Sequence, residues 1–160
     1  MAKKIEKTNA ARLLDRAGIP YKMIPYEFDE NDLAAQHVAD SLGQDIKMVF
    51  KTLVLQGDKT GHIVCVVPGD MEVDLKALAK ASGNKKVEMI AMKDLLSVTG
   101  YIRGGCSPIG MKKRFPTYFH STAINYDHIY VSAGVRGLQL ELSPADLIGF
   151  VGGIVSEVAI

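Results

Sequence analysis

The chain has 160 residues, of which 48% are hydrophobic and 23% are charged, and its 19 basic and 18 acidic residues leave a formal net charge of +1. Such a composition is typical of a globular protein; it excludes a low-complexity chain, a coiled coil and a repeat protein, and residues 1–160 are expected to form a single domain. The balanced charge excludes a whole-molecule attraction to nucleic acid, so any such contact requires a local basic patch.

The N-terminus and the cysteines set the expected environment. Residues 1–7 are charged and lack the apolar core of a signal peptide, and no apolar run has the length that spans a bilayer. A cytoplasmic location without membrane contact is the default expectation. Cys65 lies in an apolar segment and Cys106 lies among glycines, which fits neither a disulfide framework nor a metal site. We expect two free thiols, no metal and no organic cofactor.

Short helices alternate with strands along the chain. From the N-terminus, the pattern predicts a helix over 10–17, a strand over 21–28, a helix over 32–42, strands over 48–56 and 62–68, a helix over 74–81, a strand over 85–89 and a helix over 92–98. Farther on, it predicts strands over 117–119, 128–132 and 137–142 and a helix over 145–150, while residues 153–160 form either a last strand or a frayed tail. Gly18, Gly43 and Gly83 follow three of the helices, where a left-handed residue commonly ends a helix.

Lys51 stands in the middle of the apolar segment M-V-F-K-T-L-V-L-Q, residues 48–56. A buried ammonium group is costly unless it reaches water, an acidic partner or an anionic ligand. Extension to an exposed face and binding of an anion explain this lysine equally well. The sequence of the strand leaves both interpretations open.

Two loops rich in small residues suggest a shared cleft. Residues 100–110 read G-Y-I-R-G-G-C-S-P-I-G, and residues 131–137 read V-S-A-G-V-R-G. Glycine lets a ligand approach main-chain N–H groups, although most glycine-rich segments are ordinary turns. The first loop precedes the basic run 112–114, which is either a solvated surface or a contact for a phosphate backbone.

The usual catalytic motifs are absent from the sequence. There is no P-loop, no dinucleotide-binding G-x-G-x-x-G, no zinc-deaminase pattern and no G-x-S-x-G nucleophile elbow. Cys106 has no evident base, so we expect a structural or pocket-lining thiol rather than a nucleophile. Ser107 and Ser132 suit hydrogen bonding to a polar ligand, and Tyr26 either covers a ligand or spans core and surface.

The motifs F-K-T-L-V (residues 50–54), G-Y-I-R-G-G-C-S-P-I-G, K-K-R and V-S-A-G-V-R-G-L, in this order, resemble the YbaK family. That family comprises free-standing relatives of the editing domain inserted in bacterial prolyl-tRNA synthetases. The resemblance covers nearly the whole chain. It implies an α+β fold, with a mixed, largely closed β-barrel flanked by short helices.

The resemblance also implies an activity: hydrolysis of mischarged aminoacyl-tRNA, with Cys-tRNA(Pro) as the expected substrate. In the implied mechanism the substrate's own thiol attacks the ester and backbone N–H groups stabilise the oxyanion. The residues implied as catalytic are Lys51, Gly104, Gly105 and Ser107. The residues implied as substrate-binding are Tyr26, Thr52, Cys106, Pro108, Gly110, Ser132 and Gly134, and those implied to contact tRNA are Lys112, Lys113 and Arg114.

Three questions about function stay open at this point. Cys106 and Ala133 depart from the family pattern, so a deacylase of another amino-acid specificity is an alternative. The lack of a side-chain catalyst also permits a non-catalytic module that binds aminoacyl-tRNA or a synthetase, and the near-neutral charge permits a general small-molecule binder. The expected partners are the acceptor end of an aminoacyl-tRNA and, as a candidate, prolyl-tRNA synthetase.

Overall fold

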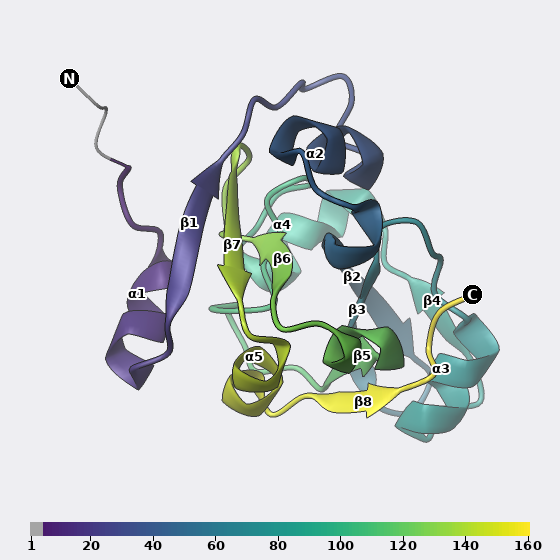
Figure 1. The fold of residues 1–160 in the computed structure, drawn as a ribbon. Helices are drawn as coiled ribbons and strands as arrows, with labels where there is room; N and C mark the ends of the chain where they lie inside the picture. The colour runs from purple at the N-terminus through teal and green to yellow at the C-terminus, as the bar shows by residue number, and fades with distance from the viewer. Residues whose placement is uncertain (1–4) are drawn as a thin grey trace.

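Two β-sheets share one hydrophobic core in the structure, a computed structural model that describes residues 5–160 (Figure 1). Residues 1–4 of the charged N-terminal segment lie outside the described residues. The shared core combines side chains from α1, from both sheets and from α5, among them Leu14, Val66, Phe119, Leu140 and Leu147. Burial of this apolar surface is the main force that holds the two sheets together.

Five α-helices and three short 3-10 helices surround the sheets in the described chain. They are α1 (Asn9–Ala17), α2 (Ala35–Leu42), η1 (Ile46–Met48), α3 (Leu75–Ser82), η2 (Met92–Asp94), α4 (Leu95–Thr99), η3 (Ser121–Asn125) and α5 (Pro144–Val151). Gly18, Gly43 and Gly83 end their helices in the left-handed conformation, as predicted. The helix predicted over 32–42 begins later, because Asp32 instead forms a β-bridge with Asp29. None of these helices is long and apolar enough to cross a membrane.

The first sheet has three antiparallel strands in the order β1 (Tyr21–Pro25), β7 (Leu138–Leu142) and β6 (Ile129–Ser132). The strand predicted over 21–28 therefore ends earlier, although Tyr26 N still donates to Gly137 O at 2.9 Å. Along β7, Leu138, Leu140 and Leu142 face the shared core, as their alternation predicts.

The second sheet has five strands in the order β4 (Val87–Met89), β2 (Phe50–Gly57), β3 (Gly61–Pro68), β5 (Thr117–His120) and β8 (Ile154–Ser156). Strand β5 is parallel to both β3 and β8, and the other pairs are antiparallel. The last segment of the chain thus contains a strand rather than a frayed tail.

The two sheets do not close into the expected barrel. Between the described residues of the two sheets, the strand pairing is a single parallel bridge from Val49, next to β2, to Tyr130 of β6. Because each sheet ends in its own edge strands, the fold is a mixed α+β arrangement of two open sheets. Figure 1 shows the three-stranded sheet beside α1 and the five-stranded sheet on the side of α3.

Residues 157–160 are bound to the rest of the fold by backbone hydrogen bonds. His120 is 2% exposed, and its Nδ1 accepts hydrogen bonds from Val158 N and Ala159 N, each at 3.2 Å. Ile160 N donates to Glu72 O at 2.8 Å, and Glu72 N donates to Ile160 O at 2.9 Å. The segment therefore joins β5 to the loop that connects β3 with α3.

Candidate functional site

The glycine-rich residues 100–110 form an irregular loop that begins where α4 ends. Gly100 has a φ of 87° and closes the helix, and the buried Thr99 hydroxyl donates to Leu95 O at 2.8 Å and accepts from Tyr101 N at 3.0 Å. Near the other end, Ser107 Oγ accepts a hydrogen bond from Ile109 N at 3.2 Å. These side-chain bonds set the path of a segment without regular secondary structure.

The second small-residue loop, residues 131–137, contacts the first one directly. A Cβ atom placed on Gly105 would lie 3.2 Å from Val135 Cα, and Arg136 Nε donates to Arg103 O at 2.8 Å. Ser132 Oγ accepts from Gly134 N at 3.1 Å, in the same local arrangement as Ser107. The structure therefore brings the two loops together, as a shared site requires.

A pocket of about 340 Å³ lies at these loops, on the side of α1. The loops contribute Tyr101 and residues 133–135 to its lining, and the segment before and at the start of α1 contributes residues 6–10. Of the sequence-predicted site residues, Gly134 lines this pocket, whereas Thr52, Gly104 and Cys106 do not. Lys51 does not line this pocket.

Lys51 and Thr52 lie on opposite faces of β2, since successive side chains of a strand alternate. Lys51 is on the face of Val49, and Thr52 is on the face of the shared core. The parallel bridge between Val49 and Tyr130 brings the start of β2 beside β6. The Lys51 side chain is 25% exposed and its Nζ lies 3.3 Å from Glu72 Oε1.

Two buried polar atoms on the strands β2 and β7 have no hydrogen-bond partner among the described residues: Thr52 Oγ1 and Gln139 Oε1. Gln139 is 5% exposed and pairs across the strands with Ser132 on one side and Ile24 on the other. Buried polar groups are normally hydrogen-bonded, so these two atoms call for a water or ligand partner that the described residues do not supply. Sequence reasoning missed Gln139, and its only signal was a polar residue between two leucines.

Two side chains of the first loop, Tyr101 and Cys106, are neutral at physiological pH. Burial raises the pKa of the Cys106 thiol to about 12, although a hydrogen bond with Thr99 opposes the change. Burial, together with the neighbouring Cys106, also raises the pKa of Tyr101 to about 12. A protonated thiol is a poor nucleophile, and Cys106 does not line the pocket described above.

The glycine amides differ in availability. Gly105 N donates to Ile102 O at 2.9 Å, so in this conformation it is engaged within the loop. Gly104, with a φ of 84°, lies against Leu33 and Arg136 and is partly exposed. Gly110 is exposed beside Tyr101, whereas Pro108 is buried.

The basic run 112–114 is exposed and diverges from the loop along the chain. The Lys112 side chain passes Gly100, at 3.3 Å from the position of a Cβ there, and Arg114 lies near Gly152 at the end of α5. Only Lys112 is thus placed directly beside the glycine loop. In the part of the chain that the structure describes, no cluster of three or more His, Cys, Asp or Glu residues is arranged to hold a metal ion.

Comparisons with known proteins agree on one family. The sequence model of the aminoacyl-tRNA editing domain matches residues 29–150. A protein of Enterococcus faecalis, named as a candidate Cys-tRNA(Pro)/Cys-tRNA(Cys) deacylase, EbsC, is 54% identical over 160 residues, which cover 99% of this chain and 98% of that protein. Proline–tRNA ligase of Fervidobacterium nodosum is 31% identical over 85 residues, which are 53% of this chain but 15% of the ligase.

A solved structure has the same fold. The crystal structure of a candidate trans-editing enzyme for prolyl-tRNA synthetase superposes with a TM-score of 0.83 at 21% identity, and the match covers 97% of this chain and 99% of that one. At this level of identity the likeness concerns the fold.

Proposed function

The chain belongs to the aminoacyl-tRNA editing domain family, and on this basis we propose that it is a deacylase that removes cysteine from mischarged tRNA. The observation that carries the proposal is the 54% identity over essentially the full length of both chains to the Enterococcus relative, whose name specifies Cys-tRNA. The contact between the two small-residue loops supports a site at their junction. Aminoacyl-tRNA is the substrate class, and Cys-tRNA(Pro) is the proposed member.

The proposed chemistry uses a nucleophile from the substrate. The cysteinyl thiol loses its proton, its sulfur attacks the ester carbonyl carbon, and the bond from that carbon to the ribose oxygen breaks. The ribose oxygen takes up a proton, and the amino acid leaves as a cyclic thiolactone that water then opens. The protein needs to hold the aminoacyl group in the reactive geometry and to stabilise the negative oxygen, and neither task requires a protein nucleophile.

Separate parts of the site are proposed for separate tasks. The Lys51 ammonium binds a phosphate of the tRNA acceptor end, and the Gly104 N–H is the available backbone donor for the oxyanion. The unpaired Thr52 Oγ1 and Gln139 Oε1 offer acceptors for the substrate's ammonium or hydroxyl groups. Ser107, Ser132 and Gly134 shape the two loops through their own hydrogen bonds.

Partnership with prolyl-tRNA synthetase is a further element of the proposal. Its support is that a segment of this chain resembles part of a proline–tRNA ligase, so the same domain type occurs within that enzyme. A free-standing version gains access to mischarged tRNA when the synthetase recruits it. Affinity capture at low salt with the full chain as bait tests this, and failure to recover the synthetase contradicts it.

The decisive experiment measures ester loss from Cys-tRNA(Pro), Ala-tRNA(Pro) and Ser-tRNA(Pro) with the wild-type protein and the Lys51→Ala variant. We expect loss confined to the cysteinyl substrate and abolished by the substitution. Lys47→Ala is the matched control, since Lys47 is 63% exposed and pairs with Asp70 in a similar way. Hydrolysis of the other substrates would show another specificity, and no hydrolysis above the spontaneous rate would leave a binding module.

A further inference from the structure

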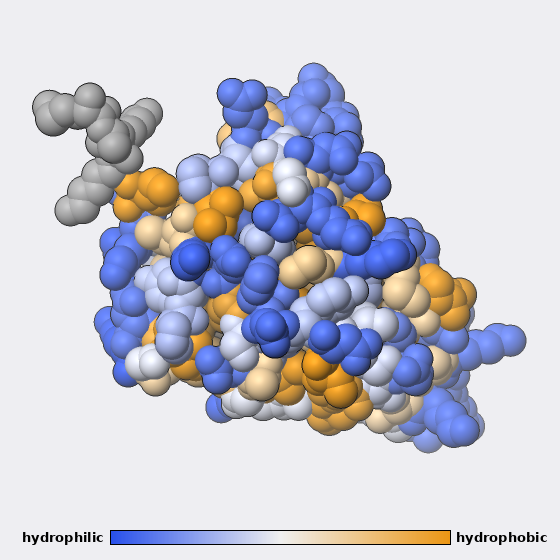
Figure 2. Space-filling view, viewed as in Figure 1, coloured by the Kyte–Doolittle hydropathy of each residue, from blue (hydrophilic) through white to orange (hydrophobic). Residues whose placement is uncertain are grey.

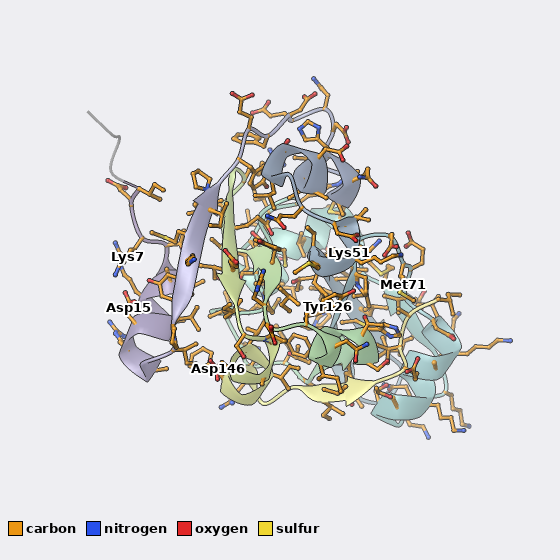
Figure 3. All side chains as sticks on the ribbon, in the orientation of Figure 1. Lys7, Asp15, Lys51, Met71, Tyr126 and Asp146 are labelled. Atoms are coloured by element: carbon orange, nitrogen blue, oxygen red, sulfur yellow. The ribbon has the colours of Figure 1, made fainter. Side chains whose placement is uncertain are left out.

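The loop between β3 and α3 presents two carboxylates to two lysines. Asp70 Oδ2 lies 3.0 Å from Lys47 Nζ, and Glu72 Oε1 lies 3.3 Å from Lys51 Nζ. Figure 3 labels Lys51 and Met71, the residue between the two acids, on the same side of the molecule. Lys51 is thus paired with a carboxylate of the protein itself.

The backbone of Glu72 is held by hydrogen bonds, whereas its side chain is largely exposed to solvent. Glu72 N donates to Ile160 O at 2.9 Å, and Ile160 N donates to Glu72 O at 2.8 Å. Two residues later, Asp74 N donates to Val158 O at 2.8 Å. The side chain itself is 81% exposed, and its hydrogen bond to Lys51 is the single side-chain contact found for it among the described residues. The carboxylate is therefore kept within reach of Lys51 but is easily displaced.

Glu72 is not what positions Lys51. The lysine belongs to the β2–β3 ladder, where it is opposite Val67, and it lies beside the partly buried Leu53 on the same face. Its side chain is 25% exposed, so most of its stem is packed against the protein. The strand places the ammonium, and the carboxylate neutralises it.

We propose that the Glu72 carboxylate occupies the place on the Lys51 ammonium that a phosphate group of the substrate takes. This inference rests on the proposed function, because it requires Lys51 to bind a phosphate of the tRNA. A polyanion must exchange with Glu72 before it contacts Lys51, and the exchange lowers the affinity for every tRNA by the same factor. Deacylated tRNA, the product, is released more readily as a result.

The test compares wild-type protein with the Glu72→Gln variant, which keeps the shape and removes the charge. Exposed ion pairs have small energies, so the KM for Cys-tRNA(Pro) is expected to fall about two- to five-fold, with kcat unchanged. The Kd for deacylated tRNA(Pro) is expected to fall by the same factor. Asp70→Asn is the matched control, and its effect on both constants is expected to be smaller.

A double variant distinguishes an effect of the Lys51–Glu72 pair from an effect of general surface charge. In Lys51→Ala protein, the further change Glu72→Gln is expected to leave the Kd for deacylated tRNA(Pro) unchanged. Three results would overturn the inference: an equal fall of this Kd in the Lys51→Ala protein, an equal fall of the Kd in the Asp70→Asn variant, or a reduced kcat in the Glu72→Gln variant. Inorganic phosphate is then tested as a competitor of the tRNA. Displacement of the tRNA shows a site that binds any phosphate group, and no displacement shows a site that requires the polymer.

Failure of the proposed function has a different signature. If Lys51→Ala protein hydrolyses Cys-tRNA(Pro) normally, the catalytic assignment of Lys51 is wrong. The binding measurements on Glu72→Gln still report on the pair in that case.

Discussion

The Gly105 backbone lies directly against the Val135 backbone, so that a methyl group on Gly105 would be 3.2 Å from Val135 Cα. This contact joins two loops that are distant in the sequence. It favours a residue without a side chain at position 105, because a Cβ there would press against the Val135 backbone, and this gives a physical reason for one glycine of the G-G pair.

We therefore expect Gly105→Ala to separate the loops. Activity is predicted to fall about tenfold or more, because displacement of site groups by an ångström is costly in rate. The free energy of unfolding is predicted to fall by about 1 to 3 kcal/mol, as for other overpacked sites. Single-turnover deacylation and urea unfolding measure the two effects.

Gly149→Ala provides the matched control for that variant. Gly149 lies within α5, and a Cβ there would meet no heavy atom within 4 Å. Alanine favours a helix over glycine by about 0.5 to 1 kcal/mol, so the protein should become more stable with unchanged activity. Unchanged activity in Gly105→Ala would contradict a functional role for the loop contact.

Thr52→Val tests whether a buried hydroxyl serves the substrate or the fold. Thr52 Oγ1 has no partner among the described residues, so its removal should leave the free energy of unfolding unchanged or slightly raised. If the hydroxyl binds substrate, the rate should fall about tenfold for the loss of one hydrogen bond. Thr122→Val, in η3, removes another buried unpaired hydroxyl and should leave the rate unchanged. A destabilised but fully active Thr52→Val protein would reverse the interpretation.

His120→Ala should destabilise the protein. The change leaves Val158 N and Ala159 N without their acceptor in a buried place, and each unpaired donor costs about 1 to 3 kcal/mol. Urea unfolding measures the change, with the more exposed His37→Ala as control. A loss of less than 1 kcal/mol would mean that water replaces the imidazole.

High pH should weaken the fold through its buried thiols and Tyr101. Burial raises the pKa values of Cys65, Cys106 and Tyr101 to about 12. Above their ordinary values, near 9 for the thiols and 10 for tyrosine, the unfolded chain loses protons that the folded chain keeps. The contribution of these three groups to stability is therefore predicted to be constant below about pH 9 and to fall between about pH 9 and 12.

Cys106→Ala should make that alkaline decline shallower, because one of the three groups no longer titrates. Urea unfolding between pH 8 and 11 provides the measurement. A decline of the same slope in the variant would place the titrating groups elsewhere.

The sequence predicted helix ends well where glycine followed a periodic segment, because the signal is local. The start of the helix predicted over 32–42 and the end of the strand predicted over 21–28 were wrong, because Asp29 and Asp32 pair with each other and the strand ends at Pro25. Both features depend on neighbours that sequence alone does not identify. The closed barrel came from family resemblance, and the pairing between sheets stops at one bridge.

Gln139 illustrates why the burial of one polar residue escaped prediction. The alternation L-Q-L-E-L assigned the leucines to the core, and by the same pattern the glutamine belonged to the outer face. In the structure that face is covered, since Ile24 and Tyr130 pack with α2 and η1. A two-residue period identifies which residues share a face, but it does not tell which helix covers it. The roles assigned to the site residues stay predictions.

The pairing of β1 with β7 also affects how the chain is made. Pro25 pairs with Leu138, so the N-terminal strand emerges from the ribosome long before its partner exists. Until then its edge is open to other chains, and pairing between such distant segments is intrinsically slow. Newly synthesised protein is therefore most exposed to aggregation before β7 appears. Figure 2 shows that hydrophilic residues cover much of one face of the folded molecule and divide the apolar residues into separate patches, a protection that the unfinished chain lacks.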